Sequence, residues 1–186
     1  DRIAWLVNEI LRDYRLQIKS GQGQLMSDLE ALFEEDFLPT TDEVSQNLAY
    51  HDPKVKQNKW EEVKAHLLSA ILKIEVRGVH GVKNTRGLEY HNIEELDYDL
   101  YKDTGLSVIA VGGSKLSRGI TLEGLSVSYY LRTAKMYDSL MQMGRWFGYR
   151  RGYEDLPRVW MFNEVFQRFE FLAQVELEIR DEIKRY

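Results

Sequence analysis

The sequence predicts an α/β fold, in which a mostly parallel sheet carries helices on both faces and follows a helical N-terminal portion. Three compact apolar runs, at residues 107–113, 126–131 and 158–162, have the composition of buried strands. Helical patterns at 134–147 and 164–184 follow the last two runs. Short apolar strands that alternate with helices are typical of parallel sheets.

The N-terminal portion, residues 1–72, has apolar residues at helical spacing. Residues 2–19 form one continuous apolar stripe, which predicts an amphipathic helix. A second, shorter helix is predicted near 25–33, and a third over 60–71. Between them, a proline and a polar run at 39–58 predict a loop.

The α/β core is expected over residues 73–186, and the two portions together are expected to form one structural domain, a fragment of a larger protein. A short strand is predicted at 74–79. The run 107–113 is apolar up to its terminal glycines, which is typical of a strand buried on both faces. Since ligands bind at the carboxyl ends of parallel strands, the turn 112–119 and the loop after Leu131 are expected at the binding edge.

Composition sets the broad class of protein. The chain has 186 residues, enough to bury a core of its own. No apolar run approaches the ~18 residues that a membrane span needs, and no signal-peptide pattern opens the chain. The absence of cysteine excludes disulfides and thiolate metal sites. We therefore expect a cytoplasmic protein that has no membrane partner.

Charge is unevenly distributed along the chain. Residues 112–158 carry eight Lys and Arg against four acidic residues, a net +4, whereas the whole chain carries −5. A basic segment in an acidic chain indicates an anionic ligand at that surface, most simply a phosphate.

The glycine-rich turn at 112–119 is the first candidate site in this basic segment. It supplies backbone amides, hydroxyl groups and the cations Lys115 and Arg118 directly after a predicted strand. Amide dipoles and positive charge together favour phosphate binding. The patterns GxxxxGK[ST] and GxGxxG are both absent, so this is not a Walker A loop. The alternative is a tight strand exit that merely needs glycine.

The predicted helix 134–147 is the second candidate. Its inner side, expected to pack on the sheet, holds Tyr137, Leu140, Met141, Gly144 and Phe147, and its outer side holds Asp138, Gln142, Arg145 and Tyr149. Gly148 is placed to end the helix, so Arg150 and Arg151 would project from the following turn. The alternative is an amphipathic surface helix with solvated charges.

Two short motifs carry a resemblance to known families. SRGIT (117–121), and QMGRWFGYR (142–150) after an intervening strand, resemble motifs V and VI of superfamily-two helicases. The longer run over 107–161 closely resembles the bacterial Z1 domain family, described as a candidate endonuclease domain tied to helicase-type ATPases. The resemblance implies a RecA-like fold, that of the C-terminal helicase lobe, acting on DNA within a nuclease of restriction or defence type.

The resemblance also implies roles for individual residues. An arginine of motif VI reaches ATP held by the first lobe and stabilises charge on the transferred phosphoryl group. Gly144 and Arg145 match the Gly-Arg of this motif, but Gln142 lies one residue too close and Gly148 holds the second arginine position. The finger is therefore Arg145 or Arg150. In motif V, Thr121 replaces the usual acid.

The resemblance therefore implies three groups of site residues. The catalytic candidates are Arg145, Arg150 and Gln142, and the cofactor contacts are Gly144 and Arg145. The nucleic-acid contacts are Ser114, Lys115, Ser117, Arg118, Gly119 and Arg132.

The implied cofactor is ATP, with Mg²⁺ accompanying it. Both are held mainly by a lobe absent from this chain, so the chain alone is not expected to hydrolyse ATP. The implied partners are nucleic acid, taken to be DNA, and that N-terminal ATPase lobe. The usual first strand of the lobe is missing here, so swapping or homodimerisation would fill the sheet edge.

Two other functions remain open. One is a non-catalytic lobe that binds nucleic acid or a protein. The other is a metal-dependent nuclease, although the acids at 94–99 resemble a solvated loop, Glu62 and Lys64 have no partner acid, and the four histidines are scattered. Aromatic residues at 146, 147, 149 and 153 either stack on bases or pack beneath the helix end.

Overall fold

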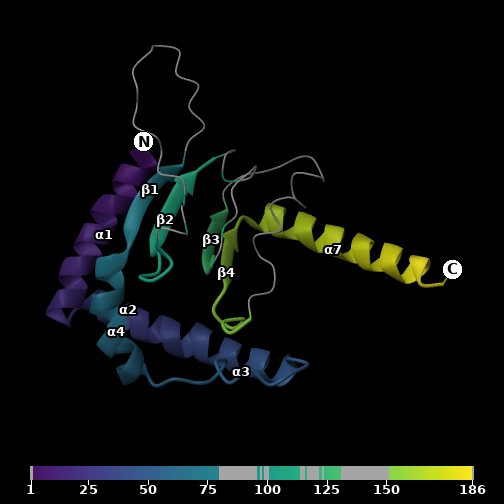
Figure 1. Cartoon of the computed structure of the whole chain (residues 1–186), viewed down its shortest axis with the longest axis horizontal. Helices are drawn as coiled ribbons and strands as arrows, with labels where there is room; N and C mark the ends of the chain where they lie inside the picture. Colours follow the sequence, from purple (N-terminus) through teal and green to yellow (C-terminus); the bar gives the residue numbers. More distant parts are fainter. Residues whose placement is uncertain are drawn as a thin grey trace, which may run out of the picture. The chain divides into compact units, whose positions relative to one another are not determined.

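A computed structural model of the chain describes residues 2–79, 96, 98, 101–113, 116, 122, 124–130 and 151–185 (Figure 1). The chain divides into two compact units, residues 1–121 and 122–186. Helices and short parallel strands are both present, which confirms a mixed α/β chain. The single domain with a boundary at residues 72 and 73 stays a prediction.

The first unit begins with the helices that the apolar stripes predict. They are α1 (Arg2–Ser20), α2 (Gln24–Leu32) and α4 (Trp60–Lys73). Helix α1 ends where Gly21 adopts φ +69°, a left-handed conformation that glycine accepts without steric cost. At the start of α4, the Glu62 carboxylate accepts a hydrogen bond from the Lys59 backbone N–H at 3.2 Å. Glu62 therefore caps a helix.

The predicted loop at 39–58 is wrong over its first half. A π-helix, η1 (Phe33–Phe37), joins α2 directly to α3 (Leu38–Asn47). Pro39 lies in the first turn of α3, where the N–H that proline lacks would have no partner within the helix. Proline there begins a helix, and the true loop starts at Leu48.

Helix α1 is fastened to the junction between α4 and the first strand. The Arg15 guanidinium donates hydrogen bonds to the backbone carbonyls of Ile71, at 3.3 Å, and Ile74, at 2.6 Å. The last carbonyls of a helix have no N–H donor within the helix, and here an arginine from a neighbouring helix donates to them. Strand β1 (Glu75–Val79) follows almost at once, beside α1 (Figure 1).

Strand β1 pairs in parallel with β2 (Val108–Gly112), in a register that joins Glu75 to Val108 and Val79 to Gly112. Both predicted strands are confirmed, as is their parallel direction. The expectation that β2 is buried on both faces is wrong, because Ile109 is 37% exposed. Among the described strands, β2 has β1 as its one neighbour.

The second unit contains β3 (Val127–Tyr130), β4 (Arg158–Met161) and α7 (Asn163–Ile183). The two strands are parallel, and all three elements confirm the sequence pattern. Tyr130, Val165 and Leu172 form a buried cluster, against which Met161 and Phe169 pack. The rings of Tyr130 and Phe169 meet edge to face, with centroids 6.4 Å apart. The predicted helix 134–147 lies outside the described residues.

No helix in the described part of the chain is both long and apolar enough to cross a membrane.

Candidate functional site

The structure describes the segments that flank the predicted contacts, and the contacts themselves lie outside it. Those outside the described residues are Ser114, Lys115, Ser117, Arg118, Gly119, Arg132, Gln142, Gly144, Arg145 and Arg150. Their roles, and the common edge expected for the two motifs, stay predictions. Two turns and one hollow are described nearby in sequence.

The first turn follows β2, at the carboxyl end of the β1–β2 pair. Gly112 is the last residue of the strand and lies opposite Val79, the last residue of β1. The Leu116 backbone N–H donates to the Gly113 carbonyl at 3.1 Å, so the chain turns immediately. The glycine-rich segment thus begins at the edge where ligands of parallel sheets bind.

Glycine at position 112 is required by close packing. A Cβ atom there would lie 2.5 Å from the Val79 carbonyl oxygen and 2.9 Å from two carbons of Leu116. Val79 is only 2% exposed, so its backbone has little room to retreat. At Gly113 a Cβ atom would meet nothing within 4 Å. Gly112 is therefore required by packing at the strand exit, as the alternative interpretation holds, whereas the space beside Gly113 would accept a larger side chain.

The second turn, Arg151 to Pro157, follows the predicted arginine-bearing helix. Gly152 adopts φ +92°, and its backbone N–H donates to the Glu154 carboxylate at 2.9 Å. The Leu156 N–H donates to the Tyr153 carbonyl at 3.1 Å, and Asp155 is buried at 5% exposure. The turn is thus organised by its own backbone and acids.

Arg158 follows this turn, and its side chain stabilises the turn backbone. Its guanidinium donates to the carbonyl of Asp155 at 2.8 Å and to that of Pro157 at 3.1 Å. Its backbone N–H donates to the Ser126 carbonyl at 2.8 Å, where β4 joins β3. One of the eight basic residues in the segment 112–158 therefore supports the backbone. Composition alone could not separate this arginine from one that binds a ligand.

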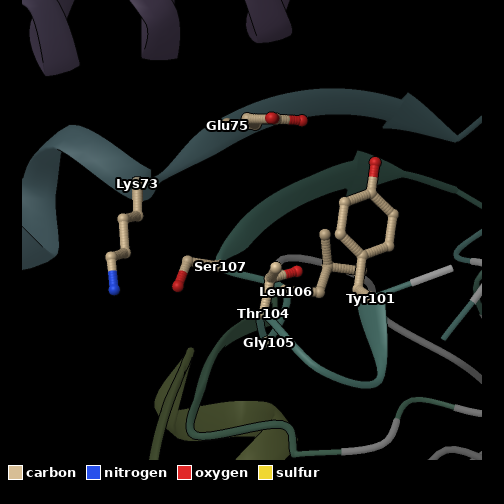
Figure 2. A pocket seen from close by; sticks show the side chains of 7 residues that line it. All are labelled: Lys73, Glu75, Tyr101, Thr104, Gly105, Leu106 and Ser107. Atoms are coloured by element: carbon tan, nitrogen blue, oxygen red, sulfur yellow. The ribbon is translucent and has the colours of Figure 1, made fainter.

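A hollow of about 470 Å³ lies at the opposite, amino-terminal end of β1 and β2 (Figure 2). The Glu75 backbone N–H donates to the Ser107 carbonyl at 2.9 Å and closes this end of the strand pair. The residues that line the hollow are Lys73, Glu75, Tyr101, Thr104, Gly105, Leu106 and Ser107. The sequence analysis did not single out these residues. The one pattern that could have indicated them is the cluster Thr104, Gly105 and Ser107 just before β2.

Arg77 holds the wall of this hollow together. Its guanidinium donates to one Glu75 carboxylate oxygen at 3.2 and 2.8 Å and to the Tyr101 hydroxyl at 2.7 Å. Its central carbon also lies 5.2 Å from the centre of the Tyr101 ring. The hydrogen bond with Glu75 raises the pKa of Arg77, and burial opposes that rise. The Arg77 side chain is 11% exposed. Through its hydrogen bond to the Tyr101 hydroxyl, this arginine links Tyr101 to strand β1.

The hollow and the glycine turn therefore lie at opposite ends of one strand pair. Lys73, the last residue of α4, and Ser107, just before β2, both line the hollow (Figure 2). Because ligands of parallel sheets bind at the carboxyl ends of the strands, the glycine turn is the better candidate site. Among the described residues, no group of three His, Asp or Glu side chains gathers to hold a metal ion.

Comparison with known proteins gives one match. The family model of the Z1 domain covers residues 1–186. No curated protein and no solved structure matches the sequence. Because the match spans the entire sequence, this chain belongs to the Z1 domain family.

Proposed function

We propose that this chain is the second, RecA-like motor lobe of a helicase-like, ATP-dependent enzyme that acts on DNA, within a bacterial nuclease of restriction or defence type. Membership of the Z1 domain family and the order of the two helicase-like motifs support this proposal. The parallel direction of both strand pairs is consistent with it, since RecA-like sheets are parallel.

The glycine turn at the carboxyl end of β2 is the observation that carries the proposal. A helicase-type lobe needs a backbone turn at that edge to contact the nucleic-acid phosphates. Glycine at 112 allows the backbone to pass close to the Val79 carbonyl at the end of β1, and a Cβ atom at Gly113 would meet no atom within 4 Å. In the proposal, Ser114, Lys115, Ser117, Arg118 and Gly119 then continue this turn along the DNA backbone, and Arg132 adds positive charge.

The nucleotide role rests on the arginines near the end of the predicted helix 134–147. Arg145 or Arg150 supplies the finger, and Gln142 and Gly144 support the nucleotide site. Bound ATP, with Mg²⁺, would supply the phosphoryl group whose developing charge the arginine stabilises. None of the described residues is assigned a nucleotide contact. Since Arg158 donates to backbone carbonyls, it is not a third candidate for the finger.

The decisive experiment replaces Arg145 and Arg150 separately by alanine in a protein that carries this lobe together with its nucleotide-binding lobe. We expect one variant to lose about 10³-fold or more of its DNA-stimulated ATPase rate while still binding ATP, as for other arginine fingers. Arg180→Ala is the matched control, because this exposed arginine of α7 pairs with Glu176 within the same unit. Unchanged ATPase in both variants would contradict the finger role.

Two other results would favour the other functions. Salt-sensitive DNA binding without any ATP turnover in the two-lobe protein indicates a non-catalytic binding lobe. Metal-dependent cleavage of plasmid DNA by this chain alone indicates a nuclease.

A further inference from the structure

The hollow at the amino-terminal end of β1 and β2 has no part in the proposed function, yet it has the size of a ligand site. Figure 2 shows that Lys73 and Glu75 come from the junction of α4 and β1, and the other lining residues from the segment 101–107. The Glu75 backbone N–H donates to the Ser107 carbonyl at 2.9 Å and joins the two segments. The volume of about 470 Å³ falls within the range of small-molecule sites.

The wall of the hollow is held in place by the fold. The Gly105 N–H donates to the Tyr101 carbonyl at 2.8 Å and closes a turn just before β2. The Arg77 guanidinium donates to the Tyr101 hydroxyl at 2.7 Å, and its central carbon lies 5.2 Å from the centre of the ring. A wall that is ordered before a ligand arrives loses little conformational freedom on binding. These contacts therefore favour binding at this place.

The charges around the hollow favour an anion. Of the described residues that line it, Glu75 alone carries a carboxylate, and this group accepts hydrogen bonds from Arg77 at 2.8 and 3.2 Å. Lys73 is the one cation in the lining, and within the described parts of the chain its ammonium group has no carboxylate partner. An anionic ligand would therefore meet Lys73 without having to displace an acid.

Two hydroxyls and an apolar surface complete the lining. Thr104 and Ser107 each carry a hydroxyl that has no hydrogen-bond partner among the residues that the structure describes. A hydroxyl can donate to an oxyanion, so both groups can act together with the lysine. Leu106 and the ring of Tyr101, both half-buried, supply the apolar surface. Sites for small organic molecules combine a few polar groups with apolar and aromatic side chains in this way.

We propose that the hollow is a ligand site that takes a small organic phosphate or carboxylate. The anionic group of the ligand is bound by Lys73 and by the hydroxyls of Thr104 and Ser107. The apolar part of the ligand packs against Leu106 and the ring of Tyr101. Because the hollow and the glycine turn lie at opposite ends of the strand pair, this site is separate from the proposed DNA contacts and does not depend on the proposed ATPase role.

Phenyl phosphate and benzoate are the probes that test this site, because each joins an anionic group to an apolar ring. NMR titration of the isotopically labelled chain reports affinity and location together. We expect saturable shifts of the Gly105, Leu106 and Ser107 amide signals, with a dissociation constant of about 1 mM for the tighter probe. The tighter probe assigns the ligand to the phosphates or to the carboxylates. Inorganic phosphate should bind more weakly than phenyl phosphate, and equal affinity would contradict the apolar contact.

Lys73→Met removes the ammonium group and keeps the aliphatic chain, so it should weaken probe binding about tenfold at low ionic strength. Ser107→Ala should weaken it about threefold. Lys102→Met is the matched control, because it removes the same charge from the turn before β2 while Lys102 does not line the hollow; binding should stay within about twofold of the parent. All three side chains are exposed, so each variant should fold, which circular dichroism verifies.

Three outcomes would overturn the inference. Absence of saturable binding below about 10 mM of either probe would mean that the hollow takes no ligand of this class. Equal weakening by Lys73→Met and Lys102→Met would reduce the effect to general surface charge. Binding that is lost in Lys115→Met and kept in Lys73→Met would assign the anion to the glycine turn, which would support the proposed phosphate contacts and refute this site.

Discussion

Gly112→Ala isolates the packing at the end of β2. The new Cβ would lie 2.5 Å from the Val79 carbonyl oxygen and 2.9 Å from Leu116 carbons. Overpacking of this kind costs about 1–3 kcal/mol. Replacing glycine by alanine also restricts the unfolded chain, which returns about 0.4–1 kcal/mol. Because the nearest atom is a backbone oxygen, which cannot move aside as a side chain can, we take the upper half of the overpacking range, about 2–3 kcal/mol, and expect a net loss of about 1–2.6 kcal/mol in the free energy of unfolding.

Gly113→Ala is the matched control, because the same methyl group one residue later meets nothing within 4 Å. Its backbone needs no left-handed conformation, so this variant should be neutral or more stable by up to about 1 kcal/mol. Urea unfolding followed by circular dichroism separates the two, with the Gly112→Ala midpoint lower by about 0.5–1 M. Equal midpoints for the two variants would refute the close approach of β1 and the turn.

Three further predictions concern Arg15 and Arg77, whose side chains bind other parts of the fold. Arg15→Met removes two hydrogen bonds to the Ile71 and Ile74 carbonyls and should cost about 1.5–3 kcal/mol in urea unfolding. Arg12→Met, on the same helix, is the control: it loses only an exposed contact with Glu9 at 3.7 Å, and its free energy of unfolding should stay within about 1 kcal/mol of the parent. If Arg12→Met and Arg15→Met lost the same stability, the carbonyl contacts of Arg15 would not be the cause. Tyr101→Phe removes an acceptor of Arg77 and should cost about 1–2 kcal/mol. The folded-state pKa of Arg77 is raised, so its stabilisation is complete below the unfolded pKa and is lost only as pH rises through the folded one. The contribution of Arg77 should therefore be constant between about pH 6 and pH 9, and a marked change there would point to another titrating group.

The elements that sequence reasoning placed correctly are those with a strong apolar period. Helices α1 and α4 and the four strands follow from stripes or compact apolar runs, because burial of those faces determines the local conformation. Helix α3 was missed because Pro39 was taken to break a helix that it in fact begins. In the sequence, a proline that ends a helix looks the same as one that begins a helix. Only the point at which the preceding helix ends distinguishes the two.

The candidate site shows a different limit of sequence reasoning. Charge density drew attention to the segment 112–158, yet Arg158 within it donates to backbone carbonyls. Arg15 and Arg77 likewise serve the fold, and neither stands out from other arginines in the sequence. A guanidinium that binds a ligand and one that holds two segments together require the same residue type. Only the positions of their acceptors separate the two roles.

The contact of Arg15 with the end of α4 also bears on how this protein is divided for experiments. A shorter version starting after Ser20 would leave the Ile71 and Ile74 carbonyls without their guanidinium donor, where the chain passes from helix to strand. The strand thus weakened is the one whose far end supports the glycine turn. Studies of DNA or nucleotide binding therefore need the leading helix retained, even though it lies far in sequence from every motif residue.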